Sequence, residues 1–219
     1  MISPKYALTH YYYGAKTLAT SIPNIVNIYV DYNCPFSAKL YVKLVDEVIP
    51  QLQVKHPNKF QFVYVNVIQP WHPNSNMLNE YGLAVAKFLR EGPRSDVDAS
   101  SIFWNVSKIL YENKEKFYDE ATVSLTRNQT YAYIAKVVNE KLPQLPFTES
   151  QVLELLDIKP SDTPSNSGNG VIGDVKYFTK YLRGVGVHVT PTISINGITT
   201  NIESGWSIDE LVKYFESQI

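Results

Sequence analysis

The stretch VDYNCPFSAK, residues 30–39, contains the only cysteine of this 219-residue chain. The run just before it, IVNIYV at 25–30, is apolar and rich in β-branched residues, which is typical of a buried strand. Pro35 follows the cysteine and opens a segment whose apolar residues have helical spacing, and proline is favoured at the first position of a helix. The pattern therefore places Cys34 where a buried strand meets the N-terminus of a helix.

The elements around this junction predict an α/β core. A second apolar run, QFVYVNVI at 61–68, makes a βαβ unit with the strand and helix before it, and its crossover should be right-handed. Near the other end, a helix should be followed by a strand at 192–195. Asn196-Gly197 then predicts a tight hairpin turn, and Ser207 with Glu210 has the pattern of a capping box that opens a C-terminal helix.

The middle of the chain has a different pattern. Apolar residues there recur at helical spacing, and no segment has the alternation or length of a convincing strand. We therefore expect a discontinuous α/β domain formed by residues 1–72 and 169–219. Residues 73–168 should form an all-helical insertion followed by a polar linker.

Composition limits the possible partners and the location. The formal net charge of −1 predicts neither a nucleic-acid partner nor an anionic membrane. One cysteine excludes an internal disulfide and a cysteine-rich metal site, so no metal is expected. No apolar run approaches the ~20 residues that cross a bilayer. The first thirty residues lack the basic and apolar regions of an export signal, from which we expect a cytoplasmic protein.

Cys34 has two interpretations. A free cysteine is often a buried, inert apolar residue. At a helix N-terminus, however, backbone N–H groups and the helix dipole stabilise a thiolate, which is the nucleophilic form of the side chain. The carboxyl ends of parallel strands are also where α/β folds place their functional sites.

Two segments together carry a resemblance to a known family. DYNCPFS at 31–37, paired with VTPTISING at 189–197, resembles the thioredoxin superfamily, and the long helical block is similar to that of its DsbA-like branch. The CPFSAK stretch is also similar to uncharacterised thioredoxin-like proteins of fungi and plants. The resemblance implies an α/β thioredoxin fold with a helical insertion, in which Cys34 is the nucleophile and Pro191, after a cis peptide bond, faces it.

Ser37 departs from the pattern of this family. Dithiol members carry a second cysteine there, which resolves mixed disulfides, and serine cannot do so. The resemblance therefore implies a monothiol thiol–disulfide oxidoreductase whose mixed disulfide on Cys34 is resolved by an external thiol such as glutathione. No tightly bound cofactor is expected. Ser37 either makes a local hydrogen bond in the first helical turn or donates to the Cys34 sulfur, and both interpretations stay open.

The expected substrate groove surrounds the thiol. Pro35, Phe36, Thr190 and Pro191 should form it, with Thr190 offering backbone hydrogen bonds to an extended substrate. Trp71 and His72 should lie at the same sheet edge, where they either line the groove or pack the insertion against the core, and packing is the favoured interpretation. Asp31 is expected to be a strand-end or capping carboxylate rather than a proton-transfer group.

Two other functions remain open. Kappa-type glutathione transferases and related isomerases share the helical insertion, but they carry serine where this chain has Cys34. The third possibility is a non-catalytic binding module that uses the same groove. The expected partner is glutathione or a thiol-containing protein or peptide, and the sequence makes no prediction of the oligomeric state.

Overall fold

A four-stranded sheet forms the centre of the fold in the computed structural model, which describes residues 1–12, 22–92 and 96–219. The strand order is β2-β1-β3-β4, with β1 parallel to β2, β1 antiparallel to β3, and β3 antiparallel to β4. The strands are β1 (Asn24–Val30), β2 (Phe60–Asn66), β3 (Thr192–Ile195) and β4 (Ile198–Thr199). The predicted βαβ unit and hairpin are therefore both present.

The hairpin has the geometry that its sequence demands. Asn196 and Gly197 have φ values of 53° and 88°. A two-residue turn of this kind needs both central residues in the left-handed region, which Asn and Gly enter at low cost. The turn carries the chain directly from β3 into β4.

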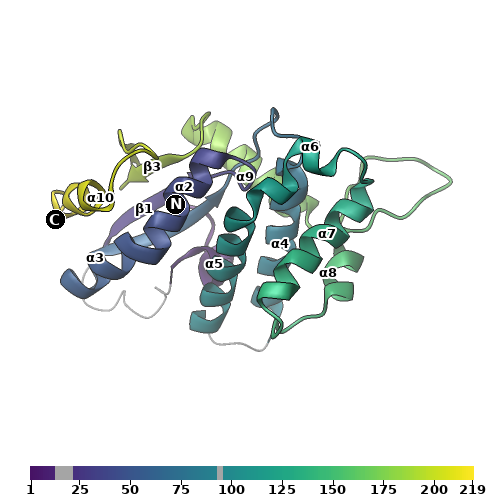
Figure 1. Ribbon diagram of the computed structural model, residues 1–219, viewed down its shortest axis with the longest axis horizontal. Coiled ribbons are helices and arrows are strands. Elements are labelled where there is room, and N and C mark those ends of the chain that lie inside the picture. Colours follow the sequence, from purple (N-terminus) through teal and green to yellow (C-terminus); the bar gives the residue numbers. More distant parts are fainter. Residues whose placement is uncertain (13–21, 93–95) are drawn as a thin grey trace.

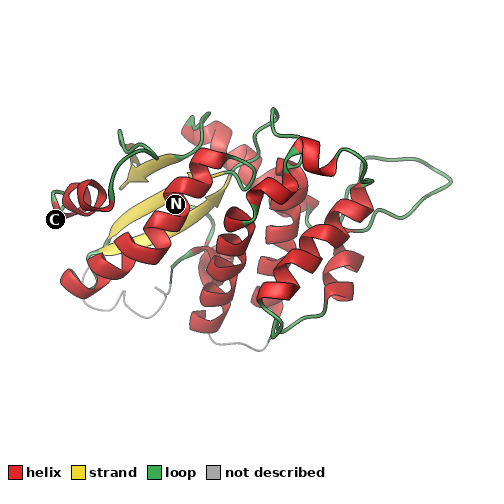
Figure 2. Cartoon of the chain, in the orientation of Figure 1, coloured by secondary structure: helices red, strands yellow, loops and turns green. Residues whose placement is uncertain are grey.

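Helices pack around this sheet, and the part of the chain between β2 and β3 is entirely helical apart from its loops (Figure 2). Figure 1 shows α2 and α3 crossing one face of the sheet, with the other helices of the middle region packed beside it. The helices are α1 (Ala7–His10), α2 (Pro35–Lys43), α3 (Ile49–Lys55), α4 (Ser75–Glu91), α5 (Asp96–Glu112), α6 (Asp119–Thr122), α7 (Arg127–Lys141), α8 (Glu149–Leu156), α9 (Ile172–Val185) and α10 (Ile208–Glu216), with short turns η1 (Pro4–Tyr6), η2 (Leu44–Val48) and η3 (Lys114–Phe117). None of these helices, within the described parts of the chain, is long and apolar enough to span a membrane.

Pro50 does not end the helix that begins at Pro35. The chain stays helical to Lys55 because the π turn η2 precedes the proline, and the Ile49 N–H donates to Leu44 O across it. A π turn changes the hydrogen-bond pattern locally, so the proline's missing N–H is accommodated within a continuous run.

The insertion and the sheet share one hydrophobic core, since the buried apolar residues of both form a single cluster. Tyr41 of α2 donates to the Trp104 carbonyl of α5 at 2.9 Å, and the hydroxyls of Tyr64 in β2 and Tyr111 in α5 lie 2.8 Å apart. The expected division into residues 1–72 with 169–219 and residues 73–168 stays a prediction, but the two parts are packed as one body.

The N-terminal segment contributes to this core, which the sequence did not predict. In α1 and the turn before it, Tyr6 donates to Asp174 of α9 at 2.7 Å and the Lys5 ammonium lies 2.5 Å from the same carboxylate. The Tyr12 N–H then donates to Phe62 O on the outer edge of β2. Residues near the start of the chain are therefore held against an element that begins about 170 residues later.

Candidate functional site

Cys34 is the N-cap residue of α2, as the strand–proline pattern predicts. The chain leaves β1 at Val30 and makes a short turn, which is closed by a 3.1 Å hydrogen bond from the Cys34 N–H to Asp31 O. Ala38 N in turn donates to Cys34 O, at the start of the helix. The side chain is buried, with 4% of the residue exposed, so only a small part of it is open to solvent.

The second motif meets the cysteine in space. The Thr190–Pro191 peptide bond is cis, which confirms the expectation drawn from the resemblance. The Cys34 thiol lies 3.5 Å from the Thr190 carbonyl oxygen and donates to it. A segment just after β2 supports this arrangement, because the Gln69 amide donates to Thr190 Oγ1 at 3.4 Å and to His188 O at 3.1 Å.

Ser37 lies in the first turn of α2 and is fully buried. Its hydroxyl accepts a 3.3 Å hydrogen bond from the Asp31 N–H, which matches the local interpretation. Within the described residues no hydrogen bond joins Ser37 to the Cys34 sulfur, and a donor role toward that sulfur stays a prediction. The hydroxyl ties the end of β1 to the start of α2.

Asp31 is more deeply buried than the sequence could show, with 0% of the residue exposed. Its carboxylate accepts hydrogen bonds from Ser75 Oγ at 2.6 Å and from Asn33 N at 3.2 Å, and its Oδ2 lies 2.6 Å from His72 Nδ1. Burial raises the pKa of this carboxyl, while the hydrogen bonds and the nearby imidazole oppose the shift. The predicted capping contact is present, at Asn33, but it is one part of a buried polar cluster.

Trp71 and His72 follow β2 and have different surroundings. His72 lies 2.6 Å from Asp31, within the α/β part of the chain, with 22% of its side chain exposed, and this contact does not decide between packing of the insertion and groove lining. Trp71 is 61% exposed, so the packing interpretation is wrong for this residue. The physical reason is that the turn after β2 directs only the imidazole toward a buried partner, and the indole is left on the surface.

Other apolar side chains near the thiol are exposed as well. Phe36, two residues after Cys34, is 62% exposed, and Val189, just before the cis-proline bond, is 64% exposed. Pro35 is also exposed, and Thr190 and Pro191 are half-buried. Single exposed apolar residues are ordinary, but three exposed large ones on the segments around one thiol (Phe36, Trp71 and Val189) are a feature of binding surfaces.

Two residues near the site were missed by the sequence analysis. Val189 lies inside the quoted motif but attracted no role. Tyr118, between η3 and α6 in the insertion, has a raised pKa because of burial, then Glu115, then the charge of Cys34. The insertion thus brings a phenol close to the thiol, and no local signal in the sequence marks a contact over this separation.

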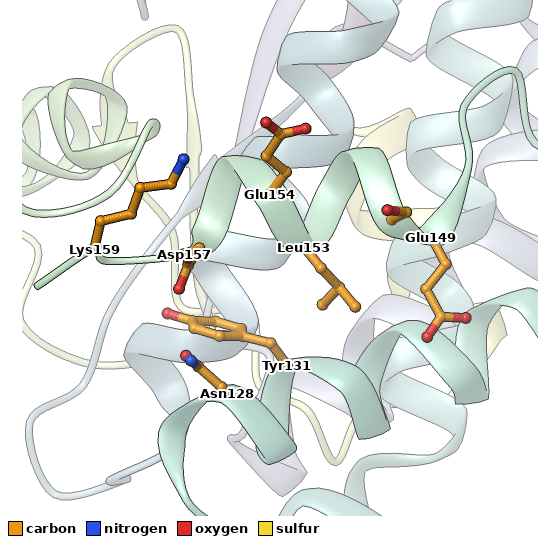
Figure 3. A pocket seen from close by; sticks show the side chains of 8 residues that line it. Asn128, Tyr131, Glu149, Leu153, Glu154, Asp157 and Lys159 are labelled. Carbon is orange, nitrogen blue, oxygen red and sulfur yellow. The ribbon is translucent and has the colours of Figure 1, made fainter.

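A separate cavity lies between α7 and α8 (Figure 3). Its volume is about 730 Å³, and Tyr131 and Leu153 face it, with Glu149, Asp157 and Lys159 around it. It shares no lining residue with the Cys34 site. Among the described residues no group of three histidine, cysteine or acidic side chains could hold a metal ion.

Comparisons with known proteins identify the fold. No protein-family model matches the sequence, and no curated protein is similar to it in sequence. A solved structure from Pseudomonas syringae, provisionally named a protein-disulfide isomerase, aligns with a TM-score of 0.65 at 23% identity, over 88% of this chain and 93% of that chain. Oxidised BdbD from Bacillus subtilis aligns with a TM-score of 0.61 at 17% identity, over 96% and 92%. DsbA from Chlamydia trachomatis gives 0.60 at 16% identity, over 96% and 91%.

The expected cytoplasmic location is wrong in the light of these neighbours. One structure with the same fold is a periplasmic thioredoxin-like protein from Salmonella enterica, and several others are thiol-disulfide oxidoreductases of the DsbA type. The expectation rested on a missing export signal, and a missing segment carries no information about where the folded chain works. Strand order, cis-proline, cysteine position and structural neighbours agree on one conclusion, that this chain has a DsbA-like thioredoxin fold with a helical insertion.

Proposed function

We propose that this protein is a monothiol thiol–disulfide oxidoreductase, with Cys34 as the nucleophile and glutathione as its co-substrate. The observation that carries the proposal is the position of the Cys34 sulfur, at the N-cap of α2 and 3.5 Å from the carbonyl oxygen that precedes cis-Pro191. The structural neighbours that are named as thiol-disulfide oxidoreductases support it at the level of fold.

The chemistry follows from the single thiol. The Cys34 thiolate attacks the disulfide between glutathione and a protein or peptide thiol, so that one mixed disulfide forms on Cys34 and one thiolate leaves. A second thiol, from free glutathione, then attacks this mixed disulfide and regenerates Cys34. The chain has no other cysteine, so the second step needs an external thiol. Electrons are exchanged only between the two external sulfur compounds.

The surroundings of the thiol suit an extended peptide. The Thr190 N–H donates no hydrogen bond to any described residue, so the segment before the cis-proline can pair with the backbone of a bound strand. Phe36, Trp71 and Val189 supply exposed apolar area beside it. We therefore propose a glutathionylated protein or peptide as the partner, held by backbone pairing and by these three side chains.

The experiment is an exchange assay on the wild type and on Cys34→Ser. Incubation with oxidised glutathione should add one glutathione to the wild type, seen by intact mass, and none to Cys34→Ser. The wild type should then release glutathione from a glutathionylated peptide when reduced glutathione is present, with Cys34→Ser inactive. A wild type that takes up no glutathione while folded, but does so after unfolding, would contradict the proposal.

One observation favours the binding-module alternative, namely that only 4% of Cys34 is exposed. A module of this kind would bind a peptide at Phe36, Trp71 and Val189 without using the thiol. The same assay separates the two functions. Equal peptide affinity of wild type and Cys34→Ser, together with no glutathione exchange by either, is the result expected of the module.

A further inference from the structure

The buried carboxylate beside the thiol has a defined set of hydrogen-bond donors. Asp31 Oδ1 accepts from Asn33 N–H and from the Ser75 hydroxyl, and Oδ2 lies 2.6 Å from His72 Nδ1. The direction of the Ser75 bond is settled by its other contacts. Ser75 Oγ already accepts from the Gln69 N–H at 3.2 Å and lies 3.4 Å from a donating Asn79 amide, so its own proton points to Asp31.

This pattern fixes the proton on the imidazole. A carboxyl group is a stronger acid than an imidazolium, so the hydrogen shared between Oδ2 and Nδ1 lies on the nitrogen, and Oδ2 accepts from His72. Nδ1 must carry the hydrogen, which leaves the lone pair of the neutral ring on Nε2. No described residue makes a hydrogen bond with Nε2, and 22% of the side chain is exposed, so this nitrogen is open to a bound molecule.

His72 belongs to a closed ring of contacts around the thiol. The Cys34 N–H donates to Asp31 O, and the Asp31 carboxylate accepts from His72. The His72 N–H donates to Gln69 O, the Gln69 amide reaches Thr190 Oγ1, and the Thr190 carbonyl accepts from the Cys34 thiol. Five contacts thus hold the imidazole and the sulfur on the same small part of the surface.

We propose that His72 is the proton donor and acceptor for the substrate sulfur in exchange at Cys34, and that Asp31 positions it by holding the hydrogen on Nδ1. This inference rests on the function proposed above. When reduced glutathione attacks the mixed disulfide, neutral Nε2 takes its thiol proton and the Cys34 thiolate leaves. When this thiolate next displaces a substrate thiolate, the imidazolium gives its Nε2 proton to the leaving sulfur, and the ring is neutral again.

The titratable groups around this pair come from several elements. The phenol of Tyr111 in α5 feels the charge of Asp31, and the phenol of Tyr118 feels those of Cys34 and Glu115. His188 lies on the segment that Gln69 binds through its backbone carbonyl. The described groups that printed contacts place around the pair are therefore Cys34, Tyr111, Glu115, Tyr118 and His188, and none of them makes a hydrogen bond to the imidazole.

The test separates the proton position from the activity. In ¹⁵N-labelled protein, NMR of the histidine side chains should show neutral His72 with its hydrogen on Nδ1. His10 gives an internal reference of the opposite kind, because its Nε2 lies 2.9 Å from Asn66 Oδ1 and its Nδ1 lies 2.8 Å from the Thr9 hydroxyl. Asn66 uses its Nδ2 toward Asn79, so its oxygen faces the His10 ring and the hydrogen of His10 is on Nε2.

Asp31→Asn is the decisive variant, because it preserves the shape of the side chain and reverses the hydrogen bond. Its amide oxygen can still accept from Asn33 and Ser75, so its NH₂ must face His72 and donate to Nδ1. The hydrogen of the neutral ring then moves to Nε2, which can no longer accept a proton. Release of glutathione from a glutathionylated peptide should fall by about 100-fold in Asp31→Asn and in His72→Gln, as is typical of a lost general acid–base group.

His56 pairs with Glu216 away from the site, so His56→Gln is the control and should keep the wild-type exchange rate. Added imidazole should partly restore the exchange rate of His72→Ala. The pH profile of the exchange rate should lose one limb in His72→Gln, and a merely structural role of His72 would not remove it. The inference is overturned if wild-type His72 carries its hydrogen on Nε2, or if His72→Gln exchanges as fast as the wild type. A wild type without any exchange overturns the proposed function itself.

Discussion

Gly82, in the middle of α4, should not tolerate a methyl group. A Cβ there would lie 2.8 Å from the Tyr32 hydroxyl oxygen and 3.0 Å from Cε2 of the same ring. Tyr32 is fully buried and cannot move easily, because it stacks on Tyr64 with 5.6 Å between ring centroids and bonds to Ser107 Oγ at 2.8 Å. Gly82→Ala must therefore displace a fixed ring two residues before Cys34.

Two effects of opposite sign decide the result. Alanine is favoured over glycine within a helix by about 1 kcal/mol. Overpacking of a filled core costs about 1–3 kcal/mol, and loss of the Tyr32–Ser107 hydrogen bond costs about 1 kcal/mol. The steric cost is the larger, so Gly82→Ala should lower the free energy of unfolding by about 1–3 kcal/mol.

Urea unfolding, followed by circular dichroism, measures this change. Gly173→Ala in α9 is the matched control, because its Cβ position has no heavy atom of any other described element within 4 Å, and it should be stabilised by about 0.4–1 kcal/mol. Combining Gly82→Ala with Tyr32→Phe removes the contacting oxygen, so the double variant should lose less free energy of unfolding than the two single variants lose together. A Gly82→Ala protein as stable as Gly173→Ala would refute the reasoning.

Three further predictions concern pH, mechanism and substrate. Burial lowers the pKa of His10 to about 3, so the unfolded chain binds one more proton than the folded chain between pH 3 and about 6.5. The free energy of unfolding should therefore fall by about 1.4 kcal/mol per pH unit as the pH decreases through this range. In urea titrations at several pH values His10→Gln should flatten this slope, and an unchanged slope would contradict the prediction. Ser37→Cys should form a bridge with Cys34, since the first and fourth residues of such a turn are within disulfide reach, and should reduce insulin without glutathione. A bridge without activity would indicate that the groove has no substrate. Trp71→Ala should raise KM for a glutathionylated peptide about 10-fold at unchanged kcat, because covering about 60 Å² of indole is worth about 1.5 kcal/mol, and an equal KM would exclude this contact.

The elements that were predicted correctly are those with local signals. Ser207 with Glu210 forms the expected capping box, and the Asn196 turn has the expected geometry. The four-residue α1 was missed because one turn is too short to show periodicity. From sequence alone, Pro50 was expected to end or bend the helix that begins at Pro35, because the π turn that lets the helix continue has no sequence signature of its own.

The candidate site could be predicted only in part. Cys34 and Pro191 stand in recognisable local patterns, and the sequence places both. The pairing of His72 with Asp31 joins residues 41 positions apart, and the burial of Asp31 depends on the helices packed over it. A carboxylate at the end of a strand looks the same in sequence whether it faces water or an imidazole, so its role needed the fold.

The attachment of the N-terminal segment to α9 determines the order in which this protein can be completed. Tyr6 and Lys5, in the turn η1, find their partner at Asp174, so these two contacts cannot form until α9 has been synthesised. At about 5–20 residues per second, a ribosome needs roughly 10–35 s to make the 168 residues between Tyr6 and Asp174. During that time both side chains of each nascent chain lack this partner, and the contacts form only when the last fifth of the protein is being made.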